Sequence, residues 1–174
     1  MPLSVALPAP PSDAELEQLF VETAPLHTAL AARLLGDADA AHDAVQEAWI
    51  RAWRARGQVQ EQRTAAAWLR KIVVRECLRT LRWRSVRRWV GLESAELLAA
   101  DVPVLDVLVD AERVARVRAA LARLPPQQRV AWTLRVEEGW PLADIAATLE
   151  VSPETVKTHL ARATARLRSQ LDVV

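Results

Sequence analysis

The four glycines of this chain mark where its helical segments end. Gly36, Gly57, Gly91 and Gly139 each follow a run in which apolar residues recur every three or four positions. That interval matches the 3.6-residue period of an α-helix. So few glycines, together with the absence of tyrosine, argue against a turn-rich all-β chain. Ala, Leu, Arg and Glu dominate and favour helices. We therefore predict an all-α protein.

The predicted helices form two groups, which we expect to be two small helical domains. The first domain, 13–90, is expected to hold helices over 13–35, 39–56 and 64–89. The second domain, 106–174, is expected to hold helices over 106–124, 127–137, 141–149 and 152–171. Residues 91–105 have little amphipathic order and are predicted to form an acidic linker, and the proline-rich residues 1–12 a disordered tail.

Several function classes lack the residues that they need. The single cysteine, Cys77, excludes a disulfide framework and a cysteine-based zinc site, and the three histidines are too scattered for a metal cluster. We find no glycine-rich phosphate loop, nucleophile elbow or metal-ligand set, so we expect no enzyme and no cofactor. The absence of a long apolar run and of a signal-peptide pattern predicts a cytoplasmic protein without membrane contact.

The net charge of +1 conceals four blocks of alternating sign. Residues 1–47 carry −7, residues 48–90 carry +10, residues 91–112 carry −6 and residues 113–174 carry +4. Of the 23 basic residues, 21 are arginine, which suits bidentate contact with phosphate. Two separate basic blocks in a nearly neutral chain are typical of a nucleic-acid binder.

The segment 141–171 has the pattern of a helix-turn-helix. Two predicted helices are separated by the three residues 150–152, and the second helix is amphipathic and basic. Its outward face offers Glu154, Lys157, Thr158, Ala161, Arg162 and Arg166. This face predicts binding in a DNA major groove. The alternative is a solvated face on a helical bundle.

The third predicted helix carries a basic face. This face consists of Lys71, Arg75, Arg79 and Arg82, at steps of four, four and three residues. Trp83 and Trp89 lie among further arginines, a combination that suits stacked bases and phosphates of a single strand. Packing of these two rings within the protein is an equally open interpretation.

Other residues of these helices are expected in the core. We expect Trp49, Trp53 and Trp68 to pack there, and Cys77 to act as a small buried hydrophobe. Glu76 falls on the apolar side of its helix, so we expect an arginine partner for it.

The second predicted helix has a distinctive outward face. Its buried stripe is expected to be Ala41, Val45, Ala48, Trp49 and Ala52. The opposite side carries Asp43, Gln46, Glu47 and Ile50. An apolar residue among acids and amides indicates a protein-binding patch or one ordinary exposed isoleucine.

These segments together resemble a known family. The resemblance rests on Asp43–Trp53, Trp68–Ile72 with Arg79 and Leu81-Arg82, Ala120–Arg129, Gly139, Asp144–Ala146, Thr155–Lys157 and Arg162-Ala163. In order and spacing they resemble bacterial RNA polymerase sigma factors of the extracytoplasmic-function class of the sigma-70 family. The similarity spans about 13–171.

The resemblance implies three binding surfaces. Asp43, Gln46, Glu47 and Ile50, called the clamp face below, would dock on the polymerase β′ clamp. Residues 57–64 and the basic face, together with Trp68, would hold the melted strand at the −10 element. Lys157, Thr158, Ala161 and Arg162, called the duplex face below, would meet the −35 element.

The implied partners are core RNA polymerase (β′ clamp and β flap), promoter DNA and an anti-sigma factor. The acidic linker would occupy the RNA exit path, and in the free chain we expect it to fold back on the basic surfaces. A stand-alone helix-turn-helix regulator is the alternative, but it leaves the clamp face and the 64–89 helix unexplained. A helical adaptor that binds only protein leaves the +10 block unexplained.

The chain departs from the family pattern at three positions. Arg75 stands where asparagine is usual and Arg79 where aspartate is frequent, and both add charge to the surface expected to face the strand. Glu150 stands where the helix-turn-helix usually has glycine. If Glu150 adopts a positive φ, the cost is about 1 kcal/mol.

Overall fold

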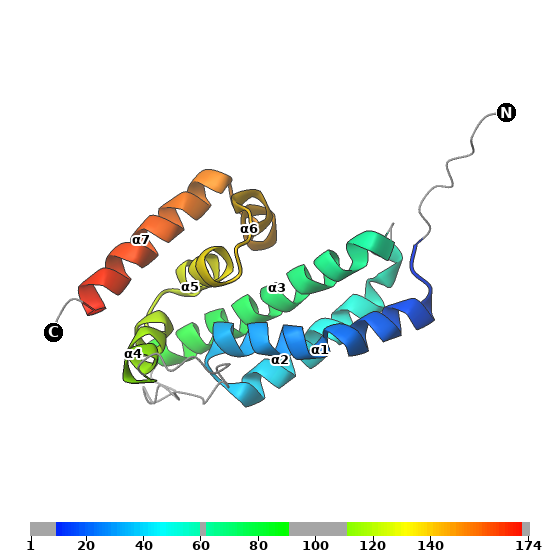
Figure 1. The fold of residues 1–174 in the computed structure, drawn as a ribbon, viewed down its shortest axis with the longest axis horizontal. Helices are drawn as coiled ribbons and strands as arrows, with labels where there is room; N and C mark the ends of the chain where they lie inside the picture. Colours follow the sequence, from blue (N-terminus) through cyan, green and yellow to red (C-terminus); the bar gives the residue numbers. More distant parts are fainter. Residues whose placement is uncertain (1–9, 60–61, 91–110, 172–174) are drawn as a thin grey trace.

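The structure, a computed structural model, describes residues 10–59, 62–90 and 111–171 (Figure 1). All regular structure in these ranges is helical, which confirms the all-α prediction. The helices are α1 (Asp13–Leu35), α2 (Ala38–Arg54), η1 (Arg56–Gln58), α3 (Gln62–Trp89), α4 (Ala111–Ala122), α5 (Pro126–Trp132), η2 (Thr133–Glu137), α6 (Leu142–Leu149) and α7 (Pro153–Leu171). The predicted linker 91–105 and residues 1–9 of the predicted tail lie outside the described residues.

The first helices begin and end at residues that satisfy their free backbone groups. The Ser12 hydroxyl accepts from the Glu15 N–H at 3.3 Å, and the Glu15 carboxylate accepts from the Ser12 N–H at 2.8 Å. This reciprocal capping box starts α1. Gly36, in the left-handed region at φ 65°, ends α1, and the Asp37 carboxylate then caps α2 by accepting from the Ala40 N–H at 3.0 Å.

Helices α1, α2 and α3 form the N-terminal unit. Its α2 contributes a stripe of small buried residues, Ala41, Ala44, Val45, Ala48 and Ala52. Trp49, which we expected on the buried stripe, is half-buried and stacks on Phe20 of α1, with ring centroids 5.7 Å apart. The alanines let α1 and α3 approach α2 closely, and the two rings pack in an apolar cluster with Leu16 and Leu69.

Helices α4 to α7 form the C-terminal unit, which contains the predicted helix-turn-helix. The backbone turns between α6 and α7 at Glu150, which has φ 57° and ψ 46°, and the Glu150 N–H donates to the Ala146 carbonyl. Glu150 therefore does adopt a positive φ, the case for which the strain cost was stated above. Ser152 then caps α7, because its hydroxyl accepts from the Thr155 N–H at 3.1 Å.

The two units pack directly on each other, a contact that the spacing and charge arguments do not predict. Helices α5 and α6 lie against α3 (Figure 1). One cluster of buried apolar side chains contains Val73, Val74 and Leu78 of α3 together with Val130 of α5 and Ile145 of α6. The structure thus shows a closed arrangement in which the helix-turn-helix rests on the N-terminal unit.

No helix within the described residues is both long and apolar enough to cross a membrane.

Candidate functional site

The clamp face lies on the outer side of α2, opposite the buried alanine stripe. Asp43 and Gln46 are exposed, Ile50 has 46% of its surface exposed, and Glu47 is half-buried. The four side chains therefore share one face, as the helical spacing predicts.

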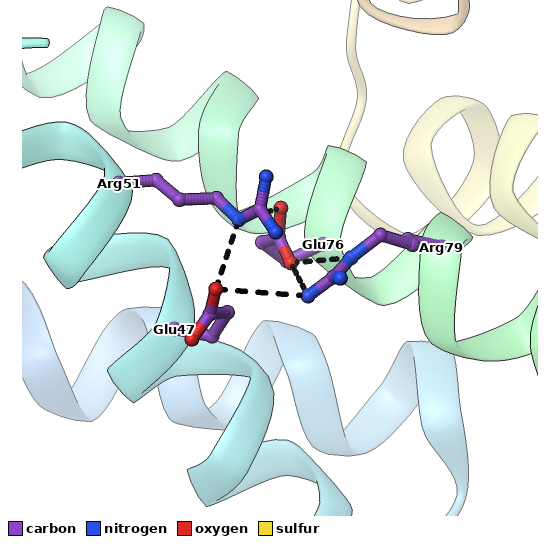
Figure 2. A network of polar contacts seen from close by, with 4 residues as sticks. All are labelled: Glu47, Arg51, Glu76 and Arg79. Atoms are coloured by element: carbon purple, nitrogen blue, oxygen red, sulfur yellow. Dashed lines mark hydrogen bonds and ion pairs between the residues drawn. The ribbon is translucent and has the colours of Figure 1, made fainter.

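Glu47 also belongs to a network of charges that joins α2 to α3 (Figure 2). Its carboxylate lies 3.1 Å from Arg51 Nε and 3.9 Å from Arg79 Nη2. Beneath them, the Glu76 carboxylate lies 2.9 Å from Arg51 and 2.6 Å from Arg79, and only 7% of its side chain is exposed. The arginine partner expected for Glu76 is confirmed, and there are two. The network places the clamp face in electrostatic contact with one residue of the basic face.

The basic face of α3 is divided between solvent and the C-terminal unit. Lys71 Nζ lies 3.3 Å from the Asp144 carboxylate of α6. Arg75 donates to the carbonyls of Ala147 and Thr148, each at 3.2 Å. Arg75 also lies 3.4 Å from Glu150. Lys71 and Arg75 thus contact α6 and the turn after it, although 46% of the Arg75 side chain stays exposed. Arg79 is exposed but pairs with Glu76 and Glu47 of its own unit, and Arg82 is exposed.

The tryptophans of α3 occupy two environments. Trp68 is half-buried against a cluster that includes Leu16, Phe20 and Leu69, so its ring packs on the core of the N-terminal unit. Trp83 and Trp89 are 57% and 89% exposed. The Arg87 guanidinium lies over the Trp83 ring, 4.4 Å from its centroid. Exposed rings beside arginines have the form of a stacking surface for bases.

The duplex face lies on the outward side of α7. Lys157, Thr158, Ala161 and Arg162 are all exposed. The buried residues of α7 are Val156, Ala163 and Leu167, on its other side. Lys157 pairs with Glu154 at 3.1 Å, and the Thr158 hydroxyl donates to the Glu154 carbonyl at 3.1 Å. The structure leaves this face open to a ligand.

Sequence reasoning missed the residues that hold the two units together. The Glu138 carboxylate lies 2.6 Å from Arg33 of α1 and 2.7 Å from Arg70 of α3. The Arg70 guanidinium also lies 4.8 Å from the centroid of the Trp140 ring. Because Arg70 and Glu138 are 68 positions apart, no helical spacing relates them. The nearest signal in the sequence is the Glu137-Glu138 pair within a block of net charge +4.

Burial displaces the pKa values of Arg129 and Cys77. Burial lowers the pKa of Arg129 to about 10, so this side chain keeps its charge at neutral pH although it is only 6% exposed. Burial, with the nearby Glu76 charge, raises the pKa of the Cys77 thiol to about 12. The expectation that Cys77 is a small buried hydrophobe is confirmed. No group of His, Cys, Asp and Glu within the described residues could hold a metal ion.

Comparison with known proteins places both units in one family. The family model "Sigma-70 region 2" matches residues 19–88, and "Sigma-70, region 4" matches residues 115–167. The ECF RNA polymerase sigma factor SigM of Mycobacterium tuberculosis is 37% identical over 138 residues, which are 79% of this chain and 66% of SigM. The RNA polymerase sigma-H factor of Pseudomonas aeruginosa is 32% identical over 143 residues, 77% of this chain and 74% of that protein.

A solved structure supports the same family assignment. The sigma factor RpoE of Bartonella quintana, crystallised in complex with the anti-sigma factor NepR, superposes with a TM-score of 0.67 at 25% identity. The superposition covers 91% of this chain and 98% of RpoE. A region 2 unit followed by a region 4 unit with a helix-turn-helix defines the sigma-70 class of proteins. The chain belongs to the extracytoplasmic-function group of the sigma-70 family of RNA polymerase sigma factors.

Proposed function

We propose that this chain is a transcription initiation factor without catalytic activity of its own. It joins core RNA polymerase in the cytoplasm, directs it to promoters with a −10 and a −35 element, and helps to open the DNA. The observation that carries the proposal is the order of the matches, with region 2 at 19–88 followed by region 4 at 115–167.

Contact with polymerase is assigned to the clamp face. The side chains of Asp43, Gln46 and Ile50 are exposed on this face, and no other part of the described chain covers them. A partner that buries Ile50 gains hydrophobic free energy, while Asp43 and Glu47 select a basic surrounding surface. The β′ clamp is the proposed partner here, and the β flap is the proposed partner of the C-terminal unit.

DNA contact is assigned to two surfaces of different character. The duplex face offers a lysine, an arginine and two small side chains on one helix, which suits phosphates and base edges in a major groove. The basic face of α3, near Trp68 and residues 57–64, suits the flexible backbone of a melted strand. Of residues 57–64, positions 60 and 61 lie outside the described residues.

An anti-sigma factor is the proposed regulator. Support comes from RpoE of Bartonella quintana, which was crystallised with the anti-sigma factor NepR and superposes over most of both chains. A stand-alone helix-turn-helix regulator explains the region 4 match but leaves the whole region 2 match without a role.

The test is co-purification of the full chain with core RNA polymerase. We expect Asp43→Lys with Ile50→Glu to abolish binding while helicity and Tm stay near those of the wild type, because both side chains are exposed. Glu47 is left intact since it pairs with Arg51 and Arg79.

The matched control is Glu17→Lys with Val21→Glu, an exposed acid and an exposed apolar residue on α1. This control should bind polymerase normally. Normal binding by the α2 variant, or loss of binding only together with unfolding, would refute the assignment.

A further inference from the structure

Arg129 of α5 is a buried charge without a carboxylate partner. Only 6% of the residue is exposed, its Nε meets no hydrogen-bond acceptor, and no carboxylate of the described residues forms an ion pair with it. A buried ion without a counter-ion is strongly unfavourable, so such groups are normally paired. We infer that Arg129, together with Arg84 and Arg88 of α3, forms a binding site for a small phosphate dianion, either inorganic phosphate or a phosphate monoester.

The backbone of Gly36 makes room for the Arg129 guanidinium. Gly36 ends α1 in the left-handed region, and a Cβ added there would lie 3.1 Å from Arg129 Nη2. The guanidinium therefore lies against the C-terminal end of α1. A helix C-terminus carries about half an elementary negative charge, which offsets only part of the charge of one guanidinium. Arg129 still needs an anion.

Two further arginines raise the positive charge around Arg129. Arg84 and Arg88 are one turn apart on α3 and share a face, and both charges act on Arg129. The Asp37 carboxylate lies 2.9 Å from Arg84 and also caps α2, so this acid is already engaged. Glu137, the acid whose charge acts on Arg129, forms no ion pair with it. The cluster thus has an excess of positive charge.

The form of the cluster selects the class of anion. A guanidinium donates two parallel N–H bonds to two phosphate oxygens, and several arginines around one point favour an anion with more than one charge. Arg88 is exposed and 28% of the Arg84 side chain is exposed, so a small anion can enter from solvent along α3. The burial of Arg129 excludes the backbone of a DNA strand, which is too bulky to reach it.

This site goes beyond the proposed function and does not depend on it. Arg129 belongs to the C-terminal unit and Arg84 to the N-terminal unit, and neither is part of the clamp face, the basic face or the duplex face. An anion that binds the folded chain but not the unfolded chain stabilises the fold by mass action. The stability of the chain should therefore respond to the concentration of small phosphorylated molecules.

Isothermal titration of the full chain with inorganic phosphate, in chloride buffer at constant ionic strength, measures binding directly. We expect one phosphate per chain. Arg129→Gln should raise the Kd about tenfold or more, because it removes a buried charge. Arg88→Gln should raise it severalfold, and the matched control Arg123→Gln, at an exposed arginine of the C-terminal unit, should leave it unchanged. No binding by the wild type, or an equal Kd in Arg129→Gln, would overturn the inference.

Thermal unfolding of the same variants separates a site from a general salt effect, because phosphate also stabilises proteins by exclusion from their surface. At about ten times the Kd, phosphate should raise the Tm of the wild type and of Arg123→Gln by about 3–6 °C. Arg129→Gln should show almost no rise. An equal rise in all three would mean an adventitious ion only and would refute the site. If Arg129→Gln does not fold, exposed Arg88→Gln decides by the same comparison.

Three probes identify the chemistry of the anion: inorganic phosphate, glycerol 3-phosphate and dimethyl phosphate. The first two carry a dianion and should bind, whereas the singly charged diester should bind about tenfold more weakly or not at all. Glycerol 3-phosphate bound as tightly as inorganic phosphate would assign the site to phosphate monoesters, and much weaker binding would assign it to free phosphate. Equal binding of the diester and inorganic phosphate would contradict a site for a dianion.

Discussion

Glu76 of α3 and Arg51 of α2 form an ion pair of 2.9 Å across the interface between the two helices. Because Arg51 also pairs with Glu47, the buried carboxylate determines where an arginine beside the clamp face lies (Figure 2). The core of the N-terminal unit is thereby connected to the surface to which polymerase binding is assigned.

Loss of the Glu76 carboxylate should destabilise the fold more than loss of the Glu47 carboxylate. Glu76→Ala leaves Arg51 and Arg79 without their buried partner and creates a cavity beside them. We expect the free energy of unfolding to fall by about 1–3 kcal/mol, and no more because both arginines are partly exposed. Glu47→Ala removes a half-buried acid and should cost less than about 1 kcal/mol. Urea unfolding of the two variants measures the difference, and equal losses would contradict the structural role of Glu76.

Glu150 occupies a backbone conformation that suits glycine. At φ 57°, Glu150→Gly should raise the free energy of unfolding by about 0.5–1 kcal/mol, because relief of left-handed strain outweighs the added chain entropy and a weak pair with Arg75. Glu154→Gly, within the first turn of α7, should instead lower stability by a similar amount. Thermal unfolding decides: a lower Tm for Glu150→Gly would show that the Arg75 contact matters more than the strain.

Gly36 and Gly139 share a positive φ but differ in their surroundings. An added Cβ at Gly36 would lie 3.1 Å from the Arg129 guanidinium, whereas a Cβ at Gly139 meets nothing within 4 Å. Both alanine variants should lose about 1 kcal/mol to backbone strain. Gly36→Ala should lose about 1 kcal/mol more, since buried Arg129 must shift. Equal losses would mean that Arg129 moves freely at this junction between the units.

The sequence predicts local structure well here and contacts between distant segments poorly. Periodic apolar residues and caps placed α1, α2, α6 and α7 within one or two residues of their observed bounds. An acid among apolar residues was sufficient to predict an arginine partner for Glu76, although not which one. The same reasoning missed the contacts of Glu138 and of Arg75 with the other unit, because their partners are about 70 or more positions away and no periodicity relates them.

The buried His27 should make stability depend on pH. Burial, with the Arg70 charge, lowers the pKa of His27 from 6.5 to about 4, so between these values the unfolded chain binds a proton that the folded chain does not. The contribution of neutral His27 to stability should be fully present above pH 6.5. The free energy of unfolding should fall by about 3 kcal/mol as the pH drops toward 4.

Replacing His27 by glutamine should reduce the fall in the free energy of unfolding between pH 6.5 and 4. Burial also lowers the pKa of His159, so some dependence should remain. Exposed His42→Gln serves as the control and should follow the wild type. Urea unfolding at several pH values between 4 and 7 measures the slopes, and a wild-type slope in His27→Gln would exclude this histidine as the source.

Whether the chain directs initiation is tested most directly by transcription of genomic DNA with core polymerase from the organism that encodes it. With the wild-type chain, the mapped 5′ ends of the RNA should fall at discrete positions that share two upstream elements, near −35 and −10. The Asp43→Lys, Ile50→Glu variant should lose these ends, and the Glu17→Lys, Val21→Glu control should keep them. An identical set of 5′ ends with and without the wild-type chain would contradict its role as an initiation factor.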